Sequence, residues 1–248
     1  MKSKKNFANG RPTVERKSLS LSMKRPDPSD MCPPGYHVVR GHQRTCSSGA
    51  TTWVDAHIRR NRGKIKLGLL IENLLFLFWN SKKNYPSLQP IAGFRKGAEF
   101  DGLIQFWLEY WKNQGVLFPD DLDPLMIKAL IAVESSFDPS KRTKVKGSSA
   151  AGLMQVTDQA MRVIGGFSNK KKWIEAKNNL IHVEKGDKLD PVVNIALGVR
   201  ILGHKYSQIP KNWEKNARNM IRSYYSRGEG GTEYADKVLG LYDKSKKK

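Results

Sequence analysis

The sequence contains little cysteine, few acidic residues and no long apolar run. Its 248 residues include two Cys, which excludes a scaffold held together by disulfides. The most apolar run, residues 67–79, is interrupted by Glu72 and Asn73. It is shorter than the roughly 20 residues of a transmembrane helix and predicts a core helix instead. The basic, polar start lacks the apolar stretch of a secretory signal peptide. We therefore expect a soluble protein without a recognisable export signal.

The shortage of acidic residues leaves a large positive charge. There are 44 Lys and Arg against 23 Asp and Glu, a formal net charge of +21. Residues 1–66 hold 15 basic and 4 acidic residues, so about half of the excess lies in the first quarter of the chain. This charge predicts attraction to polyanions such as nucleic acid, anionic lipid or anionic wall polymers. It does not indicate which reaction, if any, the protein catalyses.

The N-terminal part divides into two segments by composition. Residues 1–31, rich in Lys, Arg, Ser and Pro, predict a disordered basic arm, and residues 244–248 predict a short basic tail. Residues 32–63 predict a small β-hairpin module, because two V-x-x-H-x-R segments, 39–44 and 54–59, flank a Ser-Ser-Gly turn.

This module contains a cluster of potential ligands: Cys32, His37, His42, Cys46 and His57. Their spacing does not match a familiar zinc finger, so we predict no metal. A metal site and a Cys32–Cys46 disulfide remain open alternatives. The favoured interpretation is a basic hairpin that contacts an anionic polymer or is simply solvated.

From residue 64 onwards the apolar residues recur with a helical period. Residues 64–119 predict a helical extension that packs on the domain after it, with helices near 67–78 and 96–114. Residues 120–243 predict helices joined by loops, and no segment there alternates like a strand. The expected fold class is therefore mainly α.

Glu134 is the strongest candidate for chemistry. Asp123-Pro124 predicts a helix start, the next nine residues are apolar on nearly all sides, and Pro139 ends the helix soon after Glu134. A carboxyl group at the negative end of a helix dipole, among apolar neighbours, has a raised pKa, as a general acid near neutral pH requires. The alternative is an ordinary surface glutamate at a helix end.

Three further segments accompany Glu134. The small residues of 147–152 allow close backbone approach, and Gln155 offers an amide to a sugar. Residues 190–202 predict a second capped apolar helix, whose Asn194 faces either solvent or the site. Residues 217–225 predict a helix that stops at Gly228.

The order of these motifs resembles the soluble lytic transglycosylase (SLT) domain, which has a goose-type lysozyme-like fold and cleaves peptidoglycan. The resemblance covers about residues 121–243. Its elements are E-S-S-F-D-P at 134–139, A-G-L-M-Q at 151–155, N-I-x-x-G at 194–198, Y-Y-x-x-G at 224–228 and a looser E-Y-x-x-x-V at 233–238.

The resemblance implies a role for each matching residue and implies no cofactor. Glu134 matches the single catalytic residue, which acts first as general acid and then as base. The product is a 1,6-anhydromuramoyl end, made without a second carboxylate because the substrate supplies the nucleophile. The residues expected to bind the substrate are Ser135, Met154, Gln155, Asn194, Tyr225 and Tyr234.

The chain departs from the family pattern in two places. Ser226 stands where the family usually has Asn. The interval between Glu134 and Gly152 is long and contains Lys141, Arg142, Lys144 and Lys146, the last at a position where a small polar residue is common. These cations pair with substrate carboxylates or are simply solvated.

The leading interpretation is a peptidoglycan lytic transglycosylase acting in the cell wall or periplasm, or outside the cell. Its basic arm would contact an anionic wall polymer, a membrane surface or nucleic acid. One alternative is a hydrolytic muramidase of the same fold. Another is a non-catalytic wall-binding or nucleic-acid-binding protein.

Overall fold

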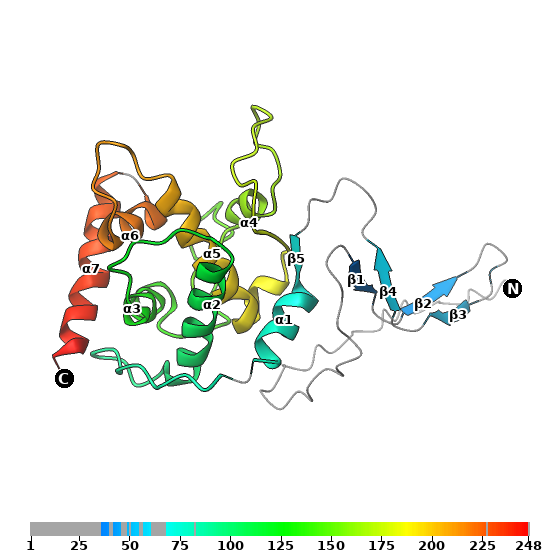
Figure 1. Ribbon diagram of the computed structural model, residues 1–248, viewed down its shortest axis with the longest axis horizontal. Coiled ribbons are helices and arrows are strands. Elements are labelled where there is room, and N and C mark those ends of the chain that lie inside the picture. Colours follow the sequence, from blue (N-terminus) through cyan, green and yellow to red (C-terminus); the bar gives the residue numbers. More distant parts are fainter. Residues whose placement is uncertain are drawn as a thin grey trace, which may run out of the picture.

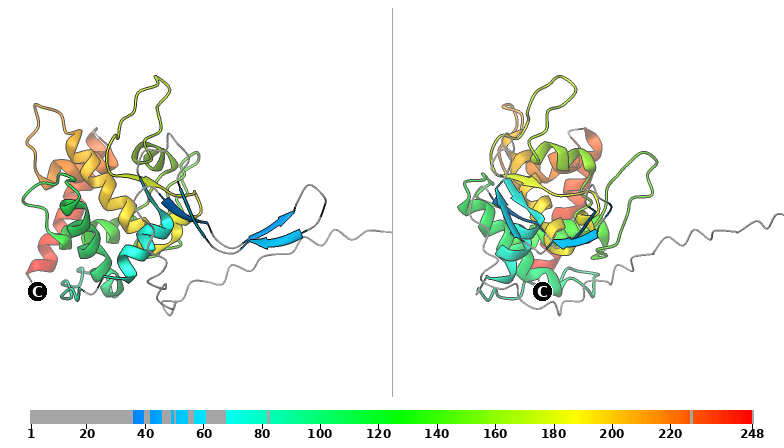
Figure 2. Two further views of the ribbon diagram at one scale, coloured as in Figure 1. Left: turned by 45° about the vertical axis from the view of Figure 1, so that its right-hand side comes forward. Right: turned by 90° about the vertical axis from the view of Figure 1, so that its right-hand side faces the viewer.

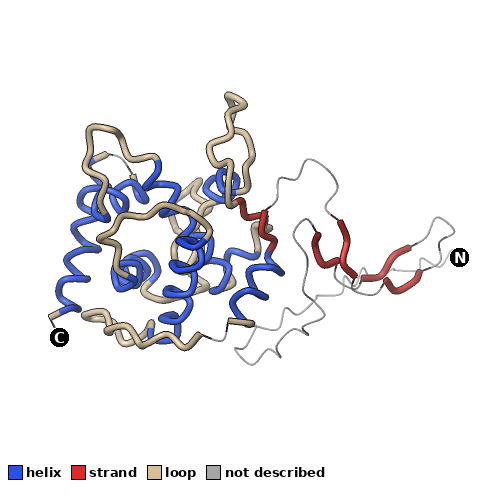
Figure 3. Tube along the Cα trace, in the orientation of Figure 1, coloured by secondary structure: helices blue, strands red, loops and turns tan. Residues whose placement is uncertain are grey.

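The computed structural model describes residues 36–39, 42–45, 49, 51–54, 57–60, 68–81, 83–226 and 228–247. Helices form its body, and short strands lie toward the N-terminal side (Figures 1 and 3). The mainly α, lysozyme-like fold class expected from the sequence is confirmed. The helices are α1 (Ile71–Trp79), α2 (Asp101–Asn113), α3 (Pro124–Ser135), α4 (Asp158–Ile164), α5 (Pro191–Ser207), α6 (Ala217–Tyr225) and α7 (Glu229–Lys246), with 3-10 turns η2 (Ala98–Phe100) and η3 (Asp187–Leu189). The strands are β1 (Tyr36–Val39), β2 (His42–Thr45), β3 (Thr51–Val54), β4 (His57–Arg60), β5 (Gly68–Leu70) and β6 (Leu180–His182).

The helices begin at residues that cap them. Asp123 accepts a hydrogen bond from Leu125 N at 2.8 Å, and Pro124 occupies the first position of α3. Asp190 caps α5 in the same way, with Pro191 next. The Asp-Pro pairs in the sequence therefore mark both helix starts correctly.

Helix α5 lies at the centre of the body. Its residues from Val192 to Gly203 are all buried, and it packs against α1, α2, α4 and α6. Figure 2 shows the other helices around it from two further directions. Helix α3 is buried from Leu125 to Ala132 and packs against α2 and α7. The two apolar helices of the sequence are thus the two interior helices, and each carries motif residues at one end.

The segment before the motif-bearing region packs onto it. Trp111 of α2 donates its indole hydrogen to Ala196 O of α5 at 3.0 Å, and Trp107 is fully buried. Lys128 of α3 is 1% exposed, and its Nζ lies 2.7 Å from Asp101 Oδ1 at the start of α2. A buried charge is tolerated when an opposite charge is paired with it, so this contact ties α2 to α3.

Several local expectations were wrong. Residues 68–70 are a strand before α1, and β5 pairs in parallel with β6, a strand that the sequence did not predict. A three-residue strand is too short to show alternation. Gly228 does not stop α6, which ends in extended backbone at Ser226; Gly228 precedes α7 instead. The expected basic tail is partly helical, because α7 continues to Lys246.

In residues 36–60, the described backbone pairs β1 with β4 and β2 with β3, both antiparallel. Val39 lies opposite His57 and His42 opposite Val54, so the two V-x-x-H-x-R segments pair with each other. The predicted arm (1–31), both cysteines and the histidine side chains of this module lie outside the described residues, and the proposed domain boundaries stay a prediction. Within the described part of the chain, no helix is long and apolar enough to span a membrane.

Candidate active site

Glu134 lies in the last turn of α3, as the sequence predicts. Its side chain is partly buried, and its Oε1 accepts a 2.6 Å hydrogen bond from the Tyr234 hydroxyl of α7. Burial raises the pKa of the Glu134 carboxyl, and this effect outweighs the opposing influence of the Tyr234 hydrogen bond, Lys141 and Lys237. The negative end of the α3 dipole acts in the same direction as burial. The carboxyl is thereby prepared to hold a proton at a pH where an ordinary glutamate loses it.

Two tyrosines surround the contact between Glu134 and Tyr234. The Tyr225 ring stacks on the Tyr234 ring, with centroids 4.9 Å apart and planes 14° apart, and Tyr225 is 62% exposed. The Tyr224 hydroxyl donates to Met154 O at 2.6 Å, and burial together with the Glu134 charge raises its pKa. Tyr225 thus presents an aromatic face to solvent beside the acid, while Tyr224 joins α6 to the G-L-M-Q segment.

The turn after Glu134 has an uncommon backbone conformation. Ser136 and Phe137 have φ of 54° and 63°, in the left-handed region that non-glycine residues rarely adopt. The buried Phe137 ring anchors the turn: it stacks on Phe100 at 6.4 Å and meets Phe94 edge-on at 5.8 Å. A Cβ at Gly97 would lie 2.6 Å from this ring, so glycine leaves room for it. The extension before the motifs therefore holds the turn that follows the acid.

The Glu134 carboxyl lies at an open cavity of about 720 Å³. The rest of its lining comes from the last residue of α3, from the chain after α3 and from the G-L-M-Q segment: Ser135, Ser136, Asp138, Ser140, Lys141, Arg142, Thr143, Lys144 and Gln155. The structure thus brings three of the cations noted in the sequence to the same cavity as the acid. The fourth, Lys146, is exposed and does not line it.

Asp138 is the other carboxylate of this lining. Its Oδ1 accepts hydrogen bonds from Ser140 N at 2.9 Å and Ser140 Oγ at 2.7 Å. These bonds, the side-chain bond first, lower the Asp138 pKa, whereas the Glu134 pKa is raised. The two carboxyl groups therefore differ in protonation tendency, and only Glu134 is suited to donate a proton.

Gln155 lines the cavity, and its amide nitrogen is bound within the protein. Nε2 donates to Lys141 O at 3.1 Å and to Gly152 O at 2.8 Å, and the residue has a left-handed φ of 46°. Gln155 therefore fastens the start of the cationic segment, a role that the sequence did not indicate. Its predicted contact with a sugar stays a prediction.

Three predicted substrate-binding side chains lie in the interior. Met154 and Asn194 are 0% exposed and Ser135 is 1% exposed. Asn194 accepts from Met154 N at 2.7 Å and donates to Ala151 O at 3.0 Å, while Ser135 Oγ donates to Ile131 O at 3.1 Å. The Met154 and Asn194 side chains contact protein rather than the cavity, because the N-I-x-x-G and G-L-M-Q motifs pack against each other. Ser135 belongs to the lining of the cavity, but its hydroxyl is bound to the backbone of α3.

Two glycines make that packing possible. Gly152 has φ of 78°, and a Cβ there would lie 2.1 Å from Asn194 Nδ2. A Cβ at Gly198 would lie 2.2 Å from Met154 Sδ. Each motif therefore needs its glycine for contact with the other motif. The two motifs occur together in the sequence because they pack against each other in the fold.

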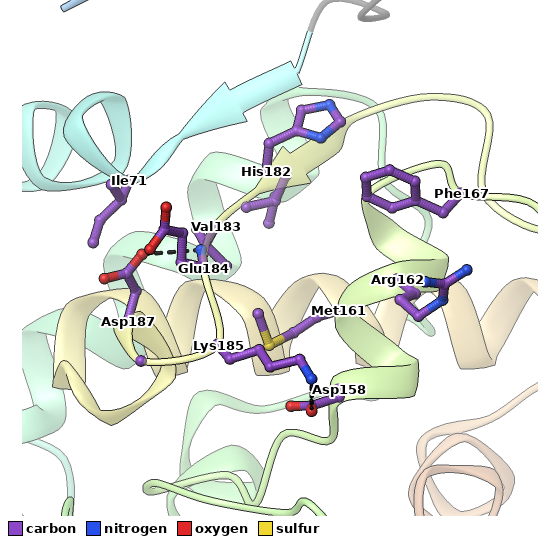
Figure 4. Close-up of a pocket in the computed structure, with 12 residues that line it drawn as sticks. Ile71, Asp158, Met161, Arg162, Phe167, His182, Val183, Glu184, Lys185 and Asp187 are labelled. Atoms are coloured by element: carbon purple, nitrogen blue, oxygen red, sulfur yellow. Dashed lines mark hydrogen bonds and ion pairs between the residues drawn. The ribbon is translucent and has the colours of Figure 1, made fainter. Parts of the chain in front are cut away.

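A second cavity of about 1010 Å³ lies between α4, β6 and Ile71 of α1 and does not include Glu134 (Figure 4). Several of its charged groups contact each other or the backbone. Lys185 Nζ lies 3.1 Å from Asp158 Oδ2, and Asp187 Oδ2 accepts from Glu184 N at 3.0 Å. Lys188 and Lys185 lower the Asp158 pKa, so Asp158 is no candidate for a proton donor. Across the described residues, no group of three or more His, Cys, Asp or Glu is placed to hold a metal ion.

The sequence also missed Lys237, which acts on the pKa of Glu134 from α7. A signal was present, because Lys237 follows Tyr234 by three residues and therefore lies on the same helix face. The helix period alone did not show that this face meets the end of α3.

Comparison with known families agrees with the motifs. The model of the family described as Transglycosylase SLT domain matches residues 119–231. Comparison with curated proteins and with solved structures gives no match. The matched segment contains Glu134, Gln155 and Tyr225, whereas Tyr234 lies just after its end. Residues 119–231 are therefore a transglycosylase SLT domain, of a family that acts on peptidoglycan.

Proposed function

We propose that the protein is a lytic transglycosylase that cleaves the β-1,4 bond between N-acetylmuramic acid and N-acetylglucosamine. One observation carries the proposal: a single carboxyl, Glu134, has a raised pKa, accepts a hydrogen bond from Tyr234 and lies at an open cavity. The cavity volume of about 720 Å³ falls in the range of small-ligand sites and suits sugar rings.

The proposed reaction uses this carboxyl twice. Protonated Glu134 donates its proton to the glycosidic oxygen while the bond between that oxygen and muramoyl C1 breaks. The resulting carboxylate then accepts the proton of the muramoyl C6 hydroxyl while O6 forms a bond to C1. Glu134 ends protonated, as it began, and no water is consumed. Tyr234 stabilises the carboxylate between the two steps by its hydrogen bond.

A hydrolytic muramidase is the second candidate, because Asp138 lines the same cavity. An ionised carboxylate across the sugar from the acid can activate water in an inverting glycosidase. The lowered pKa of Asp138 keeps it ionised, as that role requires. The two functions therefore differ in whether Asp138 takes part.

Digestion of purified sacculi, with products analysed by mass spectrometry, tests both. For a transglycosylase, muropeptide ends lack one water, Glu134→Gln lowers the rate about 10³-fold, and Asp138→Asn retains activity within a few-fold. Reducing ends together with loss of activity in Asp138→Asn would identify a hydrolase instead. Unchanged digestion by Glu134→Gln would exclude Glu134 as the acid, and circular dichroism verifies that each variant folds.

We propose the cell wall or periplasm, or the cell exterior, as the place of action, because the substrate lies there. The basic N-terminal residues would hold the enzyme on an anionic polymer of the wall. A wild-type protein that digests no sacculi, and instead binds DNA with a steep salt dependence, would favour the non-catalytic alternative.

A further inference from the structure

We propose that the segment from Lys141 to Lys144 is a carboxylate-binding subsite that directs cleavage to muramoyl residues with a charged substituent. The inference rests on the proposed function, since it names the part of the strand that this cavity prefers. The ligand chemistry is a carboxylate, supplied either by the stem peptide or, on strands without peptide, by the lactyl group.

The first observation is where the cations lie. Lys141, Arg142 and Lys144 line the same cavity as Glu134. Arg142 and Lys144 are exposed and Lys141 is partly buried. Within the part of the chain that the structure describes, none of the three forms an ion pair with a carboxylate. Elsewhere in the same part, lysines such as Lys128 and Lys188 are paired with aspartates.

The second observation is the charge balance of the lining. Its carboxylates are Glu134 and Asp138, and Asp138 is already bound to Ser140. When Glu134 holds its proton, the lining carries three positive charges against one negative charge. A substrate anion that enters this cavity therefore meets an excess of positive charge next to the acid.

The third observation is that the start of the segment is held in place. Lys141 O accepts hydrogen bonds from Gly152 N at 2.8 Å and from Gln155 Nε2 at 3.1 Å. Thr143 N donates to Ala150 O at 3.0 Å, and Arg142 forms a β-bridge with Ala151. The G-L-M-Q segment thus fixes where the cations begin relative to Glu134, so their charge stays directed at the cavity.

The test compares three substrates and a matched pair of variants. The substrates are peptide-bearing strands, amidase-stripped strands with a free lactyl carboxylate, and stripped strands whose carboxylates are converted to neutral methylamides. The test variant is Arg142→Ala/Lys144→Ala, which leaves Lys141 and its effect on Glu134 intact. Lys170→Ala/Lys171→Ala removes the same charge from an exposed segment outside both cavities and is the control.

We expect the wild type to cleave at least one charged strand with a higher kcat/KM than the neutral strand. The test variant should reduce this preference about tenfold, mainly through KM, and the control variant should keep it. Whichever charged strand loses more in the test variant identifies the source of the carboxylate. Equal cleavage of all three strands by the wild type, or equal losses in both variants, would overturn the subsite.

Binding of Glu134→Gln to the same three strands separates this inference from the proposed function. Charge-dependent binding by a protein whose wild type cleaves nothing would overturn the transglycosylase and retain the subsite. Charge-independent binding beside normal cleavage would overturn the subsite and retain the enzyme. Raising the salt concentration should weaken a genuine preference, because the cations are largely exposed.

Discussion

Helix α3 meets α7 through two tyrosine–carboxylate hydrogen bonds, one at each end. At its start, Tyr242 donates to Asp123 Oδ2 at 3.0 Å, and at its end Tyr234 donates to Glu134 Oε1 at 2.6 Å. The chemical groups are the same and the surroundings differ. Asp123 caps the helix and lies 3.8 Å from Lys246, at the end of the dipole that favours a negative charge. Glu134 lies at the opposite end, where burial and the dipole favour the neutral acid. The comparison teaches that the position along the helix decides which carboxyl supports the fold and which is available for chemistry.

The largest difference between the two contacts should appear when each hydroxyl is removed. Tyr234→Phe should lower kcat about ten- to hundredfold, since a hydrogen bond to a charged group contributes about 1.5–3 kcal/mol. The bond lowers the Glu134 pKa, so its loss should raise that pKa and move the alkaline limb of the pH–rate profile to higher pH. The measurement is the pH dependence of kcat/KM on purified strands.

Tyr242→Phe is the matched control, because it removes the same kind of bond between the same helices. It should leave kcat and the pH profile as in the wild type and reduce stability by about 1 kcal/mol. Similar kinetic effects of both variants would mean that the two ends of α3 do not differ as described.

At the capping end of α3, the loss of Asp123 should affect stability and not activity. Asp123→Ala removes the cap of α3 and should lower the free energy of unfolding by about 1 kcal/mol, and by up to about 2 kcal/mol. Asp123→Asn keeps a capping oxygen and should recover most of that loss. Urea unfolding measures both, and activity per folded molecule should stay unchanged. An activity loss without a stability loss would assign Asp123 to the site instead.

The smallest effect is the dependence of stability on pH at the catalytic end. The folded-state pKa of Glu134 is raised, so its contribution to stability is complete below the ordinary Glu pKa and is lost as pH rises through the folded value. Glu134→Gln has no carboxyl to titrate at this position, so its stability does not fall in this way as the pH rises. The variant should therefore gain stability relative to the wild type between about pH 4 and neutral pH. Paired urea unfolding across that range measures the gain, and a constant difference would show that burial does not raise the pKa.

Residues that act within one helix were predictable, and contacts between helices were not. Asp123-Pro124, the apolar run and Pro139 located Glu134 in the last turn of α3, and the direction of its pKa followed from local rules. The sequence could not show that Asn194 faces Met154 rather than a ligand, because that depends on how two distant motifs pack. The strand β6 was missed for the same reason, since its partner β5 lies more than a hundred residues earlier.

The packing around Phe137 determines how long a segment must be transferred by recombination for the site to remain intact. Phe94 and Phe100, which hold its ring, precede the segment that matches the family, and Tyr234 follows that segment. Recombination that transferred residues 119–231 alone would carry the acid without the parts that orient it. Natural shuffling and laboratory chimaeras alike would therefore need to exchange a longer stretch, from about Phe94 through α7, to pass on a working site.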